Sequence, residues 1–383
     1  MNHPRARIAA AVFATAGMLL LSACGSGDRS AAGDATATSA ADPAKAEIVA
    51  AAQQRIDQAL RTTADDIQKP PTEPFDPGTK KVMVISCSQA AAACAAESAA
   101  VVEAAELAGW TPSPILDSEF RADKVAGFVN EAINQKYDAI VYASANPNDI
   151  VDTARAAADA GIVQVAFNNP VGDALKDAVI QVTPDNVQRG HLIGDWIITQ
   201  SNCKGTVQVY DDPAYPVSTL QVHSVVEQLQ QCGDSIEMDS TDIATSDLAK
   251  PGPPFWTAAL AQNPRGSMDF AVTPYDSVSA PMARTAADQG REDVKITGFD
   301  GAPENVKLIA SGEQAVSVTS PFGYLGYVAI DQAARRMAGL PLYDATAVPA
   351  RLVTADNAAS FPNFWEPEGF DYKAMFAGIW GKK

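Results

Sequence analysis

Basic residues and histidines are scarce in this sequence. Of its 383 residues, 28 are Lys or Arg and 46 are Asp or Glu, which gives a net charge of −18. This surplus of negative charge repels phosphate groups and excludes nucleic acid as a partner. Only three histidines occur, and the motifs HExxH, CxxC, GxxxxGK and GxSxG are absent. Because His191 and His223 have no ordered nucleophile and orienting acid beside them, we expect no enzyme, no cofactor and no metal site.

The N-terminus lacks an apolar run long enough to cross a membrane comfortably. Two arginines precede the apolar stretch 8–21, which is typical of an export signal. The stretch ends in Leu21-Ser22-Ala23-Cys24, which resembles a bacterial lipobox. We therefore expect residues 1–23 to be a lipoprotein signal peptide and Cys24 to carry lipid, including an acyl chain such as palmitate, that anchors the protein outside the cytoplasm to the cell membrane. The alternative is an ordinary secretory signal with an incidental cysteine.

Apart from Cys24, cysteine is limited to four residues. An even number of cysteines in an exported chain predicts disulfide bonds. Three connectivities are possible, and we favour Cys87 with Cys94 and Cys203 with Cys232 because each pair is local to one half of the chain. The second bridge would close a loop and thereby stabilise the folded state by roughly 3–4 kcal/mol in the chain-entropy model.

The N-terminal region has few large side chains. Residues 24–42 consist mostly of small and polar residues, which predicts a flexible tether. Apolar residues at helical spacing follow from Pro43, with Asp42 as the expected N-cap, and several prolines then end the pattern. We therefore interpret residues 43–79 as a stalk helix and a Pro-rich linker.

From Lys80 onward, short apolar runs alternate with amphipathic helices, and the alternation resumes after residue 185. The expected strands are Val82–Ser86, Thr111–Leu116, Ala139–Ala143, Val163–Phe167, Val179–Val182, Thr206–Tyr210, Ser235–Asp239, Phe270–Val272 and Lys295–Phe299. Strand–helix–strand repeats predict right-handed crossovers and parallel sheets. The expected fold class is α/β, with two doubly wound parallel-sheet lobes and a ligand cleft at the carboxyl ends of their strands.

An ordered series of motifs resembles the ribose- and galactose-type periplasmic binding proteins. The series covers about residues 80 to 355 and includes Ala108-Gly109-Trp110, Asp185-Asn186, Gly194-Asp195-Trp196, Thr297–Glu304 and Ile309–Gly312. The two favoured disulfides also resemble those of actinobacterial lipoprotein members. The resemblance implies a monomeric solute-binding lipoprotein of an ABC transporter, which binds a small molecule, a sugar by default, and delivers it to a permease.

The same resemblance implies a hinge of three crossings between the lobes. The implied segments are 80–184 and 320–345 for lobe 1, 185–319 and 346–355 for lobe 2, and 356–383 for a C-terminal tail packed on the body. The crossings fall near Thr183-Pro184, Thr319-Ser320 and Leu342–Ala345. Closure of the lobes on the ligand is the expected motion.

Family positions imply several ligand contacts. Asp300 stands where the family keeps a carboxylate for ligand hydroxyls, with a helix N-cap as the alternative role. Asn168 and Asn169 take the place of an Asp-Arg pair, with an Asx turn as the alternative. Tyr275 and Asp276 take the place of an Asn-Asp pair, and Asp276 is alternatively a helix cap. The remaining expected contacts are Ser88, Gln89, Trp256, Phe322 and Thr319.

The sequence also departs from the family pattern. The loop 86–93 lacks the Asn and paired Phe that grip a pyranose ring, and the segment 216–223 lacks the expected Arg. Alanines together with nearby aromatic residues are compatible with an apolar pocket for an aromatic or steroid-like solute. These aromatic residues are Phe167, Tyr215, Phe255, Trp256, Tyr275 and Phe322. A further alternative is a sensor lipoprotein that signals ligand occupancy to a membrane partner.

Overall fold

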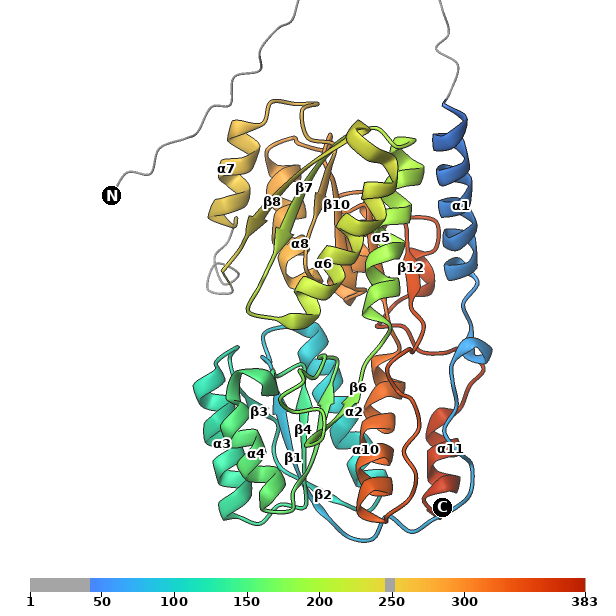
Figure 1. Cartoon of the computed structure of the whole chain (residues 1–383). Coiled ribbons are helices and arrows are strands. Elements are labelled where there is room, and N and C mark those ends of the chain that lie inside the picture. Colours follow the sequence, from blue (N-terminus) through green and yellow to red (C-terminus); the bar gives the residue numbers. More distant parts are fainter. Residues whose placement is uncertain (1–41, 245–251, 383) are drawn as a thin grey trace, which may run out of the picture. The chain divides into compact units, whose positions relative to one another are not determined.

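The computed structural model describes residues 42–244 and 252–382 (Figure 1). Cys24, the signal peptide and all but the last residue of the tether lie outside this part of the chain. The described residues form two six-stranded sheets, each flanked by helices, which is the two-lobed α/β fold that the sequence predicts. Among them, no helix combines the length and hydrophobicity required to cross a bilayer.

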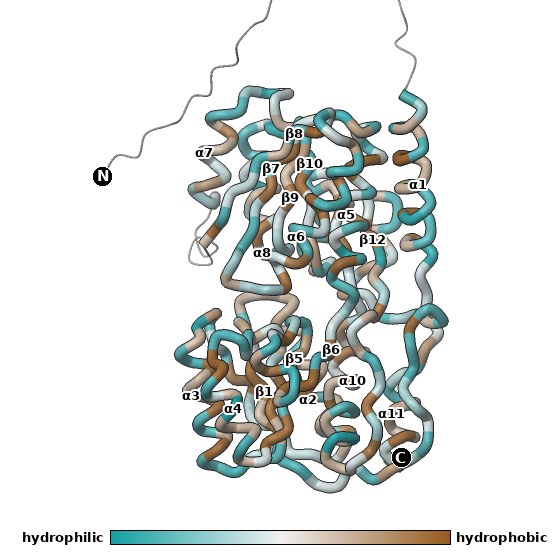
Figure 2. Tube along the Cα trace, in the orientation of Figure 1, coloured by the Kyte–Doolittle hydropathy of each residue, from teal (hydrophilic) through white to brown (hydrophobic). Residues whose placement is uncertain are grey.

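The first sheet, which defines lobe 1, is parallel and covered on both faces. Its strand order is β2-β1-β4-β5-β6, and β3 also pairs with β1. The strands are β1 (Lys81–Ser86), β2 (Thr111–Pro112), β3 (Leu116–Asp117), β4 (Ala139–Ala143), β5 (Val163–Phe167) and β6 (Val179–Val182). Helices α2 (Ala92–Leu107) and α10 (Phe322–Met337) cover one face, and α3 (Ala122–Asn134) and α4 (Val151–Asp159) cover the other. Such double coverage explains the continuous apolar strands, which Figure 2 shows in brown.

The second sheet, which defines lobe 2, has the order β12-β11-β10-β9-β7-β8, with only β12 antiparallel. Its strands are β7 (Gly205–Asp211), β8 (Ile236–Asp242), β9 (Phe270–Val272), β10 (Lys295–Asp300), β11 (Val316–Thr319) and β12 (Arg351–Val353). Helices α5 (Asn186–Ser201) and α6 (Pro216–Leu229) pack on one face, and α7 (Pro254–Gln262) and α8 (Asp276–Asp288) on the other. Helix α9 (Pro303–Ser311) follows β10. The carboxyl ends of β7, β9 and β10 therefore carry the loops that start α6, α8 and α9.

The run 111–116, expected as one strand, forms the two short strands β2 and β3 instead. Pro112 and Pro114 have no N–H to donate to a sheet ladder. Between them, Ser113 donates its N–H to the carbonyl of Val82 and accepts the Val84 N–H on its hydroxyl, at 2.8 and 3.0 Å. A side chain thus replaces the backbone partner where the prolines interrupt the strand.

Three chain segments cross between the sheets, and the first and third lie against one another. The first follows β6, where Thr183 donates its N–H to the Ala345 carbonyl at 2.8 Å and Asp185 donates to the Val348 carbonyl at 3.0 Å. The second crossing is the short link between β11 and α10, and the third is the segment that leads from α10 to β12 and contains Ala345 and Val348. The backbone bonds between the first and third crossings connect the two lobes through adjacent short segments, which is the arrangement that a hinge requires.

Helix α1 (Pro43–Leu60), interpreted from the sequence as a stalk, is docked on lobe 2. It begins as expected, with the Asp42 carboxylate accepting the Ala44 N–H at 3.1 Å. Its buried residues Ala52, Ile56 and Ala59 share one face and join the core formed by α5 and α6. Small side chains on this face permit close approach of the helix. It is therefore part of the folded body and not a free-standing stalk.

The linker after α1 and the C-terminal tail pack together on lobe 1. Phe75 donates its N–H to the carbonyl of Ile379 at 2.8 Å, and Tyr324 donates its hydroxyl to the Gln68 carbonyl at 2.7 Å. Helix α11 (Tyr372–Ile379) adds aromatic residues to the core beside α10, where Trp380 stacks on Tyr327. Residues 43–79 thus contact lobe 2 at one end and lobe 1 at the other.

Arg55 holds α1 to α5 and allows a stability test of the docking. Its guanidinium forms two bonds of 2.7 Å with the fully buried carboxylate of Asp195. We expect Arg55→Ala to lower the free energy of unfolding by about 1–3 kcal/mol in urea titrations, because a buried carboxylate loses its counter-ion. The expected loss of stability is modest because the Arg55 side chain is 43% exposed, so solvent partly screens its charge.

Arg121→Ala is the matched control for this test. Arg121 also bonds an aspartate, Asp123, through two nitrogens, but both side chains are more than half exposed. We expect no measurable loss of stability for this exposed pair, because solvent screens the two charges. Equal losses in the two variants would contradict the docking role of Arg55.

Candidate ligand-binding site

A pocket lies between the carboxyl-terminal edges of the two sheets. Its free cavity volume is about 60 Å³, and it is partly open to solvent. Both lobes supply its lining, which consists of Cys87, Ala91, Ala93, Cys94, Phe120, Ser144 and Asn168 from lobe 1 and Tyr215, Val217, Gln221, Pro274, Tyr275, Ser277 and Asp300 from lobe 2. This is the position that the doubled α/β pattern predicts for a ligand.

Asp300 reaches the pocket from the last position of β10. Its backbone adopts a positive φ of 106°, which is unusual for a residue with a Cβ. Its Oδ1 accepts a hydrogen bond from Arg189 Nη2 at 2.9 Å, and its side chain is 13% exposed. Burial raises the pKa of Asp300, while the nearby guanidinium of Arg189 opposes this rise. A paired carboxylate with limited access to solvent therefore forms part of the pocket surface.

Arg189, which the sequence analysis did not identify, supports Asp300 from behind. Its side chain is fully buried in α5 and also donates from Nη1 to Asn186 Oδ1 at 3.0 Å. Its guanidinium carbon lies 5.6 Å from the ring centroid of Phe299, the residue before Asp300. Arg189 thus holds the end of β10 by charge and by ring contact, without lining the pocket itself.

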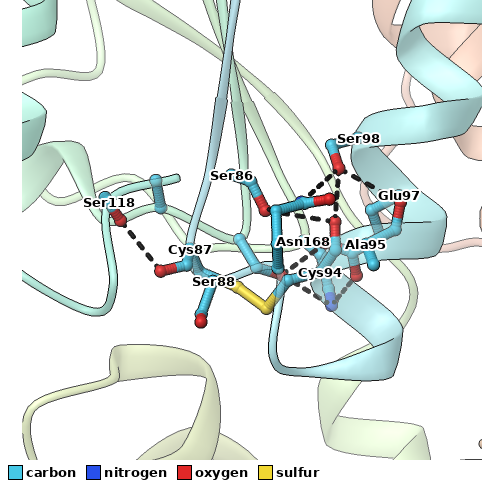
Figure 3. The surroundings of a disulfide bond; sticks show 12 residues. Ser86, Cys87, Ser88, Cys94, Ala95, Glu97, Ser98, Ser118 and Asn168 are labelled. Carbon is cyan, nitrogen blue, oxygen red and sulfur yellow. Dashed lines mark hydrogen bonds between the residues drawn. A yellow bond between two sulfur atoms is a disulfide. The ribbon is translucent and has the colours of Figure 1, made fainter. Parts of the chain in front are cut away.

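Asn168 and Ser144 present polar groups from lobe 1. They follow β5 and β4, and both adopt left-handed backbone conformations, with φ of 61° and 52°. Asn168 Nδ2 donates to Glu97 Oε1 at 2.7 Å, and Ser144 Oγ is hydrogen-bonded to Glu97 Oε2 at 2.6 Å. Figure 3 shows Glu97 and Asn168 beside the Cys87–Cys94 bridge. Asn168 Oδ1 is buried without a hydrogen-bond partner, although the residue lines the pocket.

Glu97 is a second buried ionisable residue that the sequence did not point to. It lies on α2 with no exposed surface. Burial raises the pKa of Glu97 to about 8, since removing a carboxylate from water is costly, and the charge of Asp300 raises it further. The carboxyl group is therefore mostly protonated at neutral pH.

Asp276 lies behind the pocket surface and serves its own lobe. Its Oδ2 accepts the Ala302 N–H at 2.8 Å, and its Oδ1 accepts from the Ser317 hydroxyl at 3.0 Å. Burial raises the pKa of Asp276 to about 8, with a further contribution from the charge of Asp300. The expected alternative, a cap on the helix that follows, is not observed, because Asp276 is itself the first residue of α8 and its carboxylate bonds instead to Ala302, which directly precedes α9.

Aromatic side chains form the walls. The rings of Phe120 and Tyr215, one from each lobe, meet edge to face at a centroid distance of 5.7 Å. Tyr275 lines the pocket and donates its hydroxyl to Asp212 Oδ2 at 2.7 Å, which fixes the position of its ring. The walls are therefore largely apolar, whereas the polar groups gather at the strand ends.

The loop after β1 borders the pocket through its disulfide bond. Cys87 pairs with Cys94 and Cys203 with Cys232, the favoured connectivity. Ser88 and Gln89, expected as ligand contacts, are not among the lining residues: Gln89 donates to the hydroxyls of Ser86 and Ser98, at 2.8 and 3.1 Å. The bridge and the alanines of this loop face the pocket in their place.

Four further expected contacts do not line the pocket. Trp256 is fully buried in lobe 2, where its indole N–H donates to the Met282 carbonyl, and Phe322 is buried in the core beside α10. Both large apolar rings gain more from core burial than from a solvent-facing position. Thr319 is buried at the end of β11, and Asn169 is buried and donates to the Ser144 carbonyl at 2.7 Å. Asn169 therefore orders the strand end next to the pocket.

Comparisons with known proteins identify the same architecture. Residues 82–341 match the model of the family described as periplasmic binding protein domain. The chain is similar to the structure of a sugar ABC transporter protein from Yersinia enterocolitica, with 18% identity, a TM-score of 0.69 and coverage of 82% of this chain and 99% of that one.

Two other similar structures contain bound polyols. A solute-binding protein from Bacillus halodurans with myo-inositol has 18% identity, a TM-score of 0.66 and coverage of 75% and 98%. One from Agrobacterium vitis with allitol has 19% identity, a TM-score of 0.65 and coverage of 74% and 97%. No curated protein sequence matches the chain.

The pairing of Arg189 with Asp300 predicts a pH-dependent loss of stability in Arg189→Met. Without the guanidinium, the pKa of Asp300 rises further above its ordinary value of 3.8. The folded variant then retains a proton that the unfolded chain releases, so the loss grows as pH rises above that value. We expect a loss of about 3 kcal/mol at pH 8 and a clearly smaller loss at pH 5, from urea titrations at both pH values.

Asp300→Asn in the Arg189→Met background provides the control. An amide has no charge to bury, so the double variant should recover part of the stability at pH 8 and show little additional pH dependence. An equal loss at pH 5 and pH 8 in Arg189→Met would contradict the ion-pair role.

Proposed function

Because the chain belongs to the periplasmic binding protein domain family, we propose that it is an extracytoplasmic solute-binding protein of an ABC importer. Its ligand is an uncharged, polyhydroxylated small molecule, held in the pocket between the lobes and delivered to a membrane permease. The observation that carries this proposal is the pair of hydrogen-bond acceptors, Asp300 and Asn168, that the two lobes present to one pocket.

These acceptors match ligand hydroxyl groups. A carboxylate only accepts hydrogen bonds, and the amide oxygen of Asn168 is buried without a partner. An unpaired buried acceptor costs about 1–3 kcal/mol, which a ligand hydroxyl would relieve. A bond to the Asp300 carboxylate is charge-assisted and stronger than a neutral one.

The charge balance of the pocket favours an uncharged ligand. Asp300 is paired with Arg189, and the raised pKa values of Glu97 and Asp276, each about 8, keep these two carboxyls mostly neutral at pH 7. The polar floor is therefore close to neutral, in a protein whose net charge is −18. An anionic ligand would find no free cation among the lining residues.

The apolar walls fit the other face of such a ligand. Phe120, Tyr215 and Tyr275 can contact the C–H groups of a sugar or cyclic polyol, as aromatic walls do in many small-molecule sites. Several similar structures carry ligands of this chemistry, namely allitol, alpha-D-tagatopyranose, myo-inositol and D-allose. The same walls also suit an aromatic or steroid-like solute, which makes these compounds the necessary comparison in a test.

A thermal-shift panel tests the ligand class. The panel contains myo-inositol, allitol, D-allose and D-tagatose, together with aromatic acids and hydroxylated steroids. We expect at least one polyol or sugar to raise the unfolding midpoint in a concentration-dependent way, because it binds only the folded chain. A response confined to aromatic acids or steroids would overturn the proposed ligand class.

Asp300→Ala is the site variant for the polyol or sugar identified by the panel. We expect calorimetry to show about ten- to a hundredfold weaker binding, since a charge-assisted bond is lost. Asp288→Ala removes the same charge from an exposed position on α8 outside the pocket lining and should leave the affinity unchanged. An Asp300→Ala affinity within about threefold of wild type, under roughly 0.7 kcal/mol, would contradict this site assignment.

We further propose that lipid on Cys24 anchors the protein. The support is the Leu21-Ser22-Ala23-Cys24 sequence after an export signal. In a host with a lipoprotein pathway, Cys24→Ala should move the protein from the membrane fraction to the soluble or unprocessed fraction. Metabolic labelling with a palmitate analogue should label the wild type alone. Equal membrane retention and labelling of the variant would exclude the anchor.

A further inference from the structure

We propose that Glu97 is a positioning residue for ligand binding, which orients Asn168 so that its side-chain oxygen accepts a hydrogen bond from a ligand hydroxyl. This inference rests on the proposed function. Glu97 does not line the pocket; it acts through two residues that do, Asn168 and Ser144.

The hydrogen-bond network fixes the direction of the Asn168 amide. Its Nδ2 group donates to Glu97 Oε1 at 2.7 Å and lies 3.3 Å from Ser144 Oγ. Both neighbours lie on the same side of the amide, so the Nδ2 group uses its hydrogens to bond to them. Oδ1 is thereby left without a hydrogen-bond partner, although it is buried in this structure. Glu97 therefore determines that the unpaired atom of this pocket-lining residue is an acceptor.

The backbone of both residues needs this support. Asn168 and Ser144 hold left-handed conformations with φ of 61° and 52°, which are strained for residues with a Cβ. Each is tied to the next strand, because Ser144 donates its N–H to the Phe167 carbonyl and Asn168 donates to the Val182 carbonyl, both at 2.9 Å. Glu97 links the two side chains with its two carboxyl oxygens and thus couples two neighbouring strand ends.

The surroundings of Glu97 favour its neutral form. The charged groups that act on it are Asp300 and Arg189, both from lobe 2, while the groups bonded to it from lobe 1 are the uncharged Ser144 and Asn168. In the structure, the Asn168 amide and the Ser144 hydroxyl both donate to Glu97. When the carboxyl is protonated, the second bond can reverse, because a serine hydroxyl also accepts and the acid then donates to it. Glutamine reproduces this pattern, with its carbonyl as the acceptor and its amide as the donor.

The binding test uses Glu97→Ala, Glu97→Gln and Asn168→Ala, each titrated by calorimetry with myo-inositol and with D-allose. We expect Glu97→Ala and Asn168→Ala each to weaken binding about five- to tenfold, the value of one neutral hydrogen bond. The double variant should be no weaker than Asn168→Ala, because Glu97 acts through that residue. Glu97→Gln should restore binding to within about threefold of wild type.

The pH profile separates positioning from a general structural role. Above pH 8 the wild type should bind progressively more weakly, because Glu97 loses its proton next to Asp300. Glu97→Gln has no proton to lose and should give a flatter profile. Glu103→Gln, an exposed position on the same helix paired with Lys373, is the matched control and should follow the wild type.

A measurement without ligand tests the role of Glu97 even if the thermal-shift panel identifies no ligand. In the wild type, folded Glu97 keeps its proton up to about pH 8 while the unfolded chain loses it near pH 4.5, so stability falls between these values. Between pH 5 and pH 9 we expect the Tm of Glu97→Gln to gain at least about 2 °C relative to wild type. Asp276 contributes equally to both proteins and cancels in this difference.

Three results would overturn the inference. The first is wild-type affinity in Glu97→Ala. The second is a double variant whose loss of affinity equals the product of the two single losses, and the third is failure of Glu97→Gln to restore binding.

If no sugar or polyol binds the wild type, the proposed function fails. The ligand-free series then decides whether Glu97 is the neutral link that the inference requires, and a constant Tm difference between pH 5 and pH 9 rejects it.

Discussion

The ends of three parallel strands determine the polar chemistry of the pocket. Ser144, Asn168 and Asp300 end β4, β5 and β10 in left-handed conformations, and their side chains line the same pocket. Such conformations cost of order 1–3 kcal/mol each and persist only where surrounding contacts fix them. Here the contacts come from two buried ionisable residues, Glu97 in lobe 1 and Arg189 in lobe 2. Backbone strain and buried ionisable groups are thus concentrated at the proposed site.

These two supports also connect the lobes electrostatically. The charge of Asp300 raises the pKa of Glu97, whereas that of Arg189 lowers it, although Glu97 belongs to the other lobe. These two charges of lobe 2 act on Glu97 in opposite directions, so the protonation of a lobe 1 residue responds to the charges of the other lobe.

The N- and C-terminal segments add a connection outside the family domain. The family model matches residues 82–341, yet α1 packs on lobe 2 and the linker after it packs on lobe 1 with α11. Arg335 on α10 donates to the Pro71 carbonyl at 2.8 Å, and Arg351 on β12 donates to the Leu60 carbonyl at 3.4 Å. These bonds hold one continuous segment to both lobes, in addition to the three crossings. The short stretch between these two attachments therefore forms a fourth connection between the lobes.

The sequence predicted the fold more completely than the site. Apolar runs at regular spacing located the strands, since parallel strands buried on both faces must be continuously apolar. The run 111–116 was the exception, because proline interrupts pairing without changing hydrophobicity. Trp256 and Phe322 were assigned to the site from their chemistry, but periodicity alone cannot separate a ring facing a pocket from one facing a core.

The sequence did not point to Glu97 and Arg189 as site residues, because each lies in an apolar stripe of its helix. Glu97 occupies the same helical stripe as Val101, Ala105 and Ala108, and Arg189 the same stripe as Ile193 and Trp196, all of them buried. A charged residue at an apolar position of a core-facing helix must be paired or neutralised, because isolated burial of its charge is too costly. Its partner must then come from a neighbouring strand end, since the helix faces the sheet. The stripe pattern therefore carries information about the site, but identifying the partner requires the strand register, which only the folded structure supplies.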